Sequence, residues 1–155
     1  MKPLLVCEWM HTDVMTINPE LRVERVWELM ERQHIRHLPV VKDDKLVGII
    51  TARDLKRAIF PTVPTMPIMP ASPLETAGKP QPYGLPGDLP AEAIMTRGVY
   101  TAHPTDPLLG PAAHMLKQKI GALPVVDDDG KGLGMLTETD LLKALVFLLQ
   151  RSGGS

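Results

Sequence analysis

The amino-acid sequence predicts an α/β (α+β) protein made of two βαββα-type repeats that are joined by a long proline-rich linker. Three observations lead to this prediction. Leu38-Pro39-Val40-Val41 returns as Leu123-Pro124-Val125-Val126, and residues 48–51 return as residues 134–137. Within each copy, short β-branched runs alternate with helical stripes. Between the copies, prolines dominate the sequence.

Each repeat is expected to begin with an extended piece that ends at a proline, over residues 14–19 and again over residues 99–104. A helix follows. In the first copy, Val23, Val26, Trp27 and Met30 recur at spacings of three and four, which places them on one face of a helix.

A β-hairpin comes next in each repeat. Leu38-Pro39-Val40-Val41 and residues 46–50 are short apolar runs that flank Asp43-Asp44, a pair that is typical of a turn. A second helix is expected after Thr51. Its counterpart in the second copy, over residues 141–149, is apolar nearly all round, so we expect it to be buried between the repeats or to form an oligomer contact.

The first helix of the second repeat differs from its counterpart. Asp106-Pro107 is a favourable start, because aspartate is a good N-cap and proline suits the first helical position. Pro111 would then remove a backbone donor one turn into the helix. We therefore expect a distorted first turn there.

The chain is divided into repeat 1 (1–60), the proline-rich linker (61–90), repeat 2 (91–150) and a disordered tail (151–155). Prolines at 61, 64, 67, 70 and 73 would line one edge of a polyproline II helix, which has three residues per turn. Val63, Met66 and Met69 would line another edge. The linker is interpreted as a stiff tether, with a docking strip as the alternative.

Composition excludes several classes of protein. The 155 residues are 44% hydrophobic and carry a net charge of −1, which argues against a broad nucleic-acid surface. Cys7 is the single cysteine, so no internal disulfide forms and a cytoplasmic location is expected. No apolar run reaches the roughly 20 residues that a membrane span needs, so no membrane contact is expected.

Two motifs match the sequence pattern of a capping box: Thr51-Ala52-Arg53-Asp54 and its counterpart Thr137-Glu138-Thr139-Asp140. A threonine followed three residues later by an acid lets each side chain bond the other's backbone N–H at the start of a helix. On the residues alone, a purely structural cap is the leading interpretation.

The order of these pieces, found twice, resembles the cystathionine-β-synthase (CBS) domains, which come in tandem pairs called Bateman modules. The residues that carry the resemblance are 10–19, 38–41 and 48–54, and again 95–104, 123–126 and 134–140. Together the two copies cover about four-fifths of the chain, which looks like a stand-alone CBS-domain protein.

The resemblance implies two repeats related by a pseudo-twofold axis, with two clefts between them that bind adenosine-containing ligands. Asp54 and Asp140 would accept hydrogen bonds from ribose hydroxyls, and Thr51 and Thr137 would touch ribose or the α-phosphate. The other residues implied to contact base or ligand are Thr16, Ile17, Leu38, Pro39, Ile50, Thr101, Ala102, Ala122, Leu123 and Pro124.

The two clefts are expected to differ, because phosphates need cationic partners. The first repeat supplies Arg36, His37 and Arg53, whereas the second has Gly121, Ala122 and Thr139 there. We expect the first cleft to prefer a phosphorylated nucleotide and the second to bind weakly, bind a less charged ligand or stay empty. A solvated basic surface is the alternative interpretation of the three cationic residues.

No catalytic or metal site is indicated. Cys7 and His11 have helical spacing, but two ligands are too few for a metal, and a buried thiol is the expected role of Cys7. No Ser-His-Asp arrangement or phosphate loop of the GxxxxGK[ST] type can be identified.

The leading hypothesis is a regulatory module, not an enzyme, that senses AMP, ADP or ATP, with S-adenosylmethionine or NAD as further candidates. It would act as a homodimer on a separate effector protein. The competing hypothesis is a structural or scaffold pair that mediates oligomerisation or partner docking without a ligand.

Overall fold

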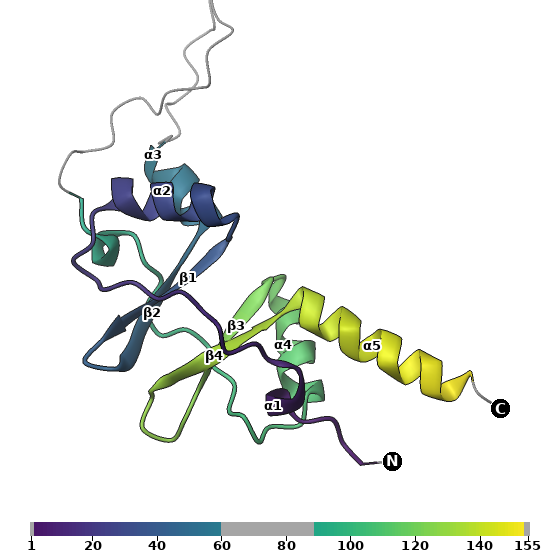
Figure 1. Ribbon diagram of the computed structural model, residues 1–155. Helices are drawn as coiled ribbons and strands as arrows, with labels where there is room; N and C mark the ends of the chain where they lie inside the picture. Colours follow the sequence, from purple (N-terminus) through teal and green to yellow (C-terminus); the bar gives the residue numbers. More distant parts are fainter. Residues whose placement is uncertain (1, 60–88, 154–155) are drawn as a thin grey trace, which may run out of the picture.

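The structure is a computed structural model that describes residues 2–59 and 89–153. It contains two α/β units, each built around one β-hairpin with helices on one side (Figure 1). The helices are α1 (Val6–Trp9), α2 (Val23–Gln33), α3 (Ala52–Ile59), the 3-10 helix η1 (Ala91–Ala93), α4 (Leu109–Gln118) and α5 (Glu138–Ser152); the strands are β1 (His37–Lys42), β2 (Lys45–Thr51), β3 (Ala122–Val126) and β4 (Gly132–Thr137). The expectations for the linker fall mostly on residues 60–88, outside the described residues.

Both predicted hairpins are confirmed. Strand β1 pairs antiparallel with β2, and β3 pairs with β4. The first hairpin turns at Asp43 and Asp44, whose φ angles of 50° and 62° are both left-handed, as the tight hairpin turn with the right twist requires. The second hairpin has the longer loop, residues 127–131 against residues 43–44. Both hairpins carry a bulge at the same place in the repeat, between Val40 and Val41 and between Val125 and Val126.

The predicted extended pieces lie along the hairpins. Ile17 forms a parallel bridge to Val40, and Ala102 forms the equivalent bridge to Val125. The Ile17 N–H donates to the Pro39 carbonyl at 3.0 Å, and the Ile17 carbonyl accepts from the Val41 N–H at 2.8 Å. Each two-stranded sheet therefore gains one further extended segment on the β1 or β3 side.

The segments at the start of the two repeats are exchanged between them. The N-terminal segment, residues 4–11, packs on the second unit: the Cys7 N–H donates to the Pro104 carbonyl at 2.9 Å, and His11 forms a bridge to Met135 in β4. The segment of residues 89–96 packs on the first unit in the same way, with Thr96 bridged to Ile49 in β2. These matching exchanges express the expected pseudo-twofold relation.

Each hydrophobic core is completed by the exchanged segment. In the second unit, Val6 is fully buried with Leu123 and Leu136. In the first unit, Ala91 and Met95 are buried with Val26 and other residues of that core. The division into repeats at residues 60 and 91 stays a prediction, and the structure adds that each core draws on residues from both.

A small third cluster joins the two units. Ile49 in β2 is buried together with Ala122 in β3 and Met135 in β4, and the partly buried Val14 and Val99 pack against them. The hairpins also meet at their turns, where the Leu46 N–H donates to the Gly130 carbonyl at 3.0 Å. The interface between the units is thus formed by strands and by the crossing segments.

The glycine of each repeated strand motif allows a close approach of the crossing segment. A Cβ on Gly48 would lie 2.8 Å from both the Met95 Sδ and the Thr96 carbonyl oxygen. A Cβ on Gly134 would collide with the His11 carbonyl oxygen. Since real Cβ atoms do not come this close to other heavy atoms, glycine is required at both positions.

The expected start of the helix at Asp106-Pro107 is wrong. Helix α4 begins at Leu109, and the Asp106 carboxylate accepts from the His103 N–H at 2.8 Å instead of capping a helix. Pro107 forms a bridge to Leu5 of the exchanged segment. Pro111 consequently lies within the first turn of α4, where its missing N–H has no intrahelical partner to lose, so no distortion is required.

Two further expectations meet a different outcome. Cys7 is exposed, not buried, because α1 turns the adjacent Val6 into the core and leaves position 7 outside. Helix α5 is not buried between the repeats: it projects from the second unit in Figure 1, and its side chains Leu142, Leu145, Val146 and Leu149 are 49–61% exposed. It also runs to Ser152, beyond the expected start of the tail.

None of the helices within residues 2–59 and 89–153 combines the length and the apolar character that crossing a membrane would take.

Candidate functional site

The first candidate site is built around Thr51 and Asp54, where β2 passes into α3. The predicted capping box is confirmed: Asp54 Oδ2 accepts from both the Thr51 N–H and the Thr51 hydroxyl, each at 2.8 Å. In return, Thr51 Oγ1 accepts from the Asp54 N–H at 3.2 Å. Asp54 is only partly buried, and among the described residues no donor bonds its second oxygen, Oδ1. One carboxylate oxygen is therefore anchored and the other is open.

The second repeat has the same box, with different surroundings. Asp140 Oδ2 accepts from the Thr137 N–H at 2.9 Å and from its hydroxyl at 2.8 Å. His11 Nδ1 lies 3.0 Å from the same oxygen, and Lys143 Nζ lies 3.6 Å from Oδ1. Asp140 is only 3% exposed. Both of its oxygens face protein donors, so this carboxylate has no open side in this structure.

The charge state of Asp140 reflects these contacts. Burial raises the pKa of its carboxyl, but hydrogen bonds from the Thr137 hydroxyl and N–H and from His11 outweigh burial and hold the pKa below its usual value. The group is therefore ionised at neutral pH and is held in place by the protein itself.

His37 lies where the two units meet, near Asp54 of the first candidate site. It is opposite Thr51 in the β1–β2 register. A Cβ on Gly121 of the second repeat would lie 3.5 Å from the His37 ring and from the Glu138 carboxylate. Burial lowers the pKa of His37, and the nearby Arg36 lowers it further, while Glu138 and Asp54 raise it by less. His37 is thus a neutral imidazole at pH 7, close to both carboxylates.

The two arginines of the first repeat take separate positions. Arg36 is exposed and borders a shallow hollow of about 290 Å³ between α2 and α3, together with Trp27 and His34. Arg53 is exposed on the first turn of α3. Neither guanidinium forms an ion pair with any residue of 2–59 or 89–153. Both charges are available to an anion.

Most of the residues implied to contact a base are parts of the cores. Leu38, Ile50 and Leu123 have no exposed surface, so in this structure neither their side chains nor their backbone groups are open to a ligand. The other buried members of the predicted set are Ile17, Pro39, Ala102, Ala122 and Pro124. Thr16 is exposed, and the partly buried Thr101 lines a hollow of about 200 Å³ with Gly48 and Val99. Their roles toward a ligand stay predictions.

His11 is the site residue that the sequence analysis missed. It is 129 positions from Asp140 in the chain, and the two meet only because residues 4–11 cross to the second unit. The position equivalent to His11 in the other crossing segment is Thr96, a residue without a ring or a charge. The difference between His11 and Thr96 is the sequence feature that could have indicated a special role for His11.

Within the described part of the chain, no three His, Cys, Asp or Glu side chains are grouped so that they could hold a metal ion.

The fold and the site can be compared with known proteins. The family model of the CBS domain matches residues 6–61 and 91–147. Protein MJ1426 of Methanocaldococcus jannaschii is 35% identical over 133 residues, which cover 78% of this chain and 79% of that protein. Homoserine O-acetyltransferase of Methanohalobium evestigatum is 30% identical, but the chain spans only 24% of its length, and it spans 46% of MJ1225 of Methanocaldococcus jannaschii.

Solved structures show the same architecture. The CBS domain pair of protein MJ0100, in complex with 5′-methylthioadenosine and S-adenosyl-L-methionine, is 27% identical with a TM-score of 0.71, over 93% of this chain and 97% of that one. Protein MJ1225 is 31% identical with a TM-score of 0.72, over 93% of this chain and 48% of that one.

Proposed function

The chain belongs to the CBS domain family as a tandem pair, and from this premise we propose that it binds an adenine nucleotide beside Asp54 and transmits the bound state to a separate protein. The proposal is confined to the first cleft, because Asp140 has its oxygens occupied by His11, Thr137 and Lys143.

The observation that carries the proposal is the carboxylate of Asp54. Thr51 fixes its Oδ2 through two hydrogen bonds of 2.8 Å, while Oδ1 has no donor among the described residues. A carboxylate held in this way can accept from a ribose hydroxyl without losing its cap. Hydrogen bonds to a charged group contribute about 1.5–3 kcal/mol each.

The surroundings of Asp54 favour a phosphorylated ligand. Arg36 and Arg53 are exposed cations without ion-pair partners in the described residues, and the N-terminus of α3 adds the positive end of a helix dipole. His37 is neutral in the free protein, and a phosphate nearby would favour its charged form. Affinity for a nucleotide should therefore rise as the pH falls toward 6.

The comparisons support a ligand that contains adenosine. The CBS domain pair of protein MJ0100 was solved with two such molecules, and its structure covers nearly all of this chain. AMP, ADP and ATP remain the leading candidates, with S-adenosylmethionine and NAD as alternatives. The arginines favour the phosphorylated members of this set.

Transmission would follow from the position of the cleft. His37 of the first repeat faces Gly121 and Glu138 of the second, so a ligand beside Asp54 reaches both units. A ligand shifts the angle between two units only to the extent that it binds one arrangement more tightly than the other. We propose that this shift is what an effector protein detects.

The proposal is tested by titrating the protein with AMP and ATP in a calorimeter. Asp54→Asn should weaken binding about tenfold or more, because it removes the charge from the hydrogen bond to ribose. Asp43→Asn, the same change in the exposed hairpin turn, is the matched control. Arg53→Ala should weaken ATP more than adenosine. Unchanged affinity in Asp54→Asn, or a flat thermal-shift panel at millimolar nucleotide, would reject the proposal.

One observation favours a second candidate function, a scaffold or dimerisation module. The apolar side chains Leu142, Leu145, Val146 and Leu149 are exposed on α5, and Leu109 and Leu116 on α4 are 80% and 82% exposed. Exposed apolar residues gathered on one element favour association with another protein or a second copy. Light scattering tests this: wild type should be dimeric, and Leu145→Glu with Leu149→Glu should be monomeric.

A further inference from the structure

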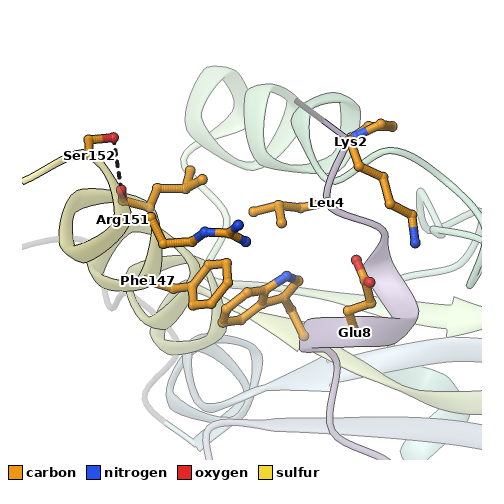
Figure 2. Close-up of a pocket in the computed structure, with 9 residues that line it drawn as sticks. Lys2, Leu4, Glu8, Phe147, Arg151 and Ser152 are labelled. Carbon is orange, nitrogen blue, oxygen red and sulfur yellow. Dashed lines mark hydrogen bonds between the residues drawn. The ribbon is translucent and has the colours of Figure 1, made fainter. Parts of the chain in front are cut away.

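A cavity lies at the opposite end of the second unit from the hairpin turn, between the N-terminal segment and the last turns of α5. It has a volume of about 500 Å³, within the range of pockets that bind small molecules. Figure 2 shows the labelled side chains Leu4, Phe147 and Arg151 directed toward a common space. The full lining is Lys2, Pro3, Leu4, Glu8, Trp9, Phe147, Leu148, Arg151 and Ser152.

The floor of the cavity is apolar and aromatic. Trp9 and Phe147 form a tilted ring pair with centroids 5.4 Å apart, and Leu4 and Leu148 add aliphatic surface. Aromatic rings of this kind provide large contact areas for an apolar body. The cavity can therefore hold a hydrocarbon or ring portion of a ligand.

The polar groups at its rim are mainly donors. The Arg151 guanidinium lies 5.3 Å from the centroid of the Phe147 ring, and neither Arg151 nor Lys2 forms an ion pair within the described residues. The one acid, Glu8, already uses Oε2 to accept from the Leu5 N–H at 2.8 Å. The rim has two cations against one carboxylate, so it favours a monoanion.

Trp9 adds a donor that lacks a partner. Its Nε1 is the one side-chain nitrogen or oxygen in the described part of the chain that is shut off from water and forms no hydrogen bond. A buried donor without an acceptor costs free energy. An acceptor group that enters the cavity and displaces the side chains over this N–H would supply the missing partner.

We propose that this cavity binds a small apolar carboxylate, with its aromatic or acyl body on Trp9 and Phe147 and its carboxylate at Arg151. The site is separate from Asp54 and independent of the nucleotide proposal. Arg151 is the specificity-determining residue. Its planar guanidinium can donate two hydrogen bonds to one carboxylate, while its alkyl chain and its contact with the Phe147 ring leave room for the apolar body of the ligand.

The test uses the full chain and two probes, 4-phenylbutyrate for an aromatic body and octanoate for an acyl body. Trp27→Phe leaves Trp9 as the sole tryptophan, so the fluorescence of Trp9 reports binding at the cavity. We expect saturable quenching by at least one probe. The neutral analogue 4-phenylbutyramide should bind about tenfold more weakly, and so should 4-phenylbutyrate to an Arg151→Gln variant.

Arg32→Gln is the matched control, because it removes the same charge from an exposed position on α2. It should bind both probes as the parent does, and AMP affinity should be unchanged in Arg151→Gln. The absence of saturable binding, or equal affinity in Arg151→Gln and Arg32→Gln, would overturn the proposal. So would a dimer that Arg151→Gln dissociates while neither probe binds, since a second copy would then occupy the cavity.

Discussion

Replacing Gly134 by alanine tests whether the crossing of the N-terminal segment is fixed by close backbone contact. The new Cβ would collide with the His11 carbonyl oxygen and lie 3.2 Å from the His11 carbonyl carbon and 3.4 Å from the Thr12 Cα. All of these are backbone atoms, which cannot move aside as the end of a long side chain could. The segment itself must shift.

The cost can be worked from the bonds that such a shift would break. The His11 N–H donates to the Met135 carbonyl at 3.0 Å, and the Met135 N–H donates to the His11 carbonyl at 2.9 Å. Each hydrogen bond contributes about 0.5–1.5 kcal/mol net, and steric overpacking alone costs about 1–3 kcal/mol. Breaking both bonds costs about 1–3 kcal/mol, and leaving the overlap in place costs about the same, so by either route we expect Gly134→Ala to lower the free energy of unfolding by about 2 kcal/mol.

The same strand provides the control. Nothing lies within 4 Å of a Cβ on Gly132, and its φ is not left-handed. Gly132→Ala should therefore be neutral or stabilise by about 0.4–1 kcal/mol, because it restricts only the unfolded chain. Urea unfolding followed by circular dichroism measures both variants as changes in midpoint at constant slope. If Gly134→Ala unfolds at the same urea concentration as Gly132→Ala, the close crossing does not hold the units together.

Two further predictions concern pH. The pKa of His37 is lowered on folding. Its contribution to stability is therefore complete above the unfolded pKa of about 6.5 and is lost as the pH falls through the folded pKa. In urea titrations between pH 7.5 and 5, His37→Gln should remove this loss of stability. The pKa of Asp140 is also lowered, so the stability that its carboxylate contributes is present above about pH 4 and is lost as the pH falls through the folded pKa. Asp140→Asn should be less stable than wild type at pH 7 and equally stable at pH 2. A constant difference in the free energy of unfolding between pH 7 and pH 2 would contradict a lowered pKa for Asp140.

The local structure can be predicted from the sequence, because the residues that determine each helix, turn and cap lie within that element. The apolar stripe through Val23, Val26 and Met30 does form the buried face of α2. Asp43-Asp44 forms the hairpin turn, and both Thr-x-x-Asp motifs form capping boxes. In each case the contacts lie within a few residues, so the side chains that decide the structure are neighbours in the chain.

The contacts around Asp54 and Asp140 could not be predicted in the same way. Val6 is the buried residue of the N-terminal segment, and the sequence of residues 4–10 does not show against which repeat it packs. That choice decides the position of His11 and explains why Leu108 donates its N–H to Leu4 instead of starting a helix at Pro107. The open oxygen of Asp54 and the closed one of Asp140 thus depend on long-range packing, although the motif spelling is the same.

The exchange of segments also couples the two units, because each crossing segment is hydrogen-bonded to one unit and continues into the other. Residues 4–11 are bonded to the second unit, yet within a few residues the same backbone reaches Ile17, which is hydrogen-bonded into the first. Residues 89–96 and Ala102 repeat this relation in the opposite direction. A shift of His11 away from Asp140 must therefore strain the connection to β1, and a shift of Thr96 must strain the connection to β3. Each sheet is thus connected to the segment that fills the other's core, so a ligand that moved one crossing segment, as the proposed function requires, would act on both units.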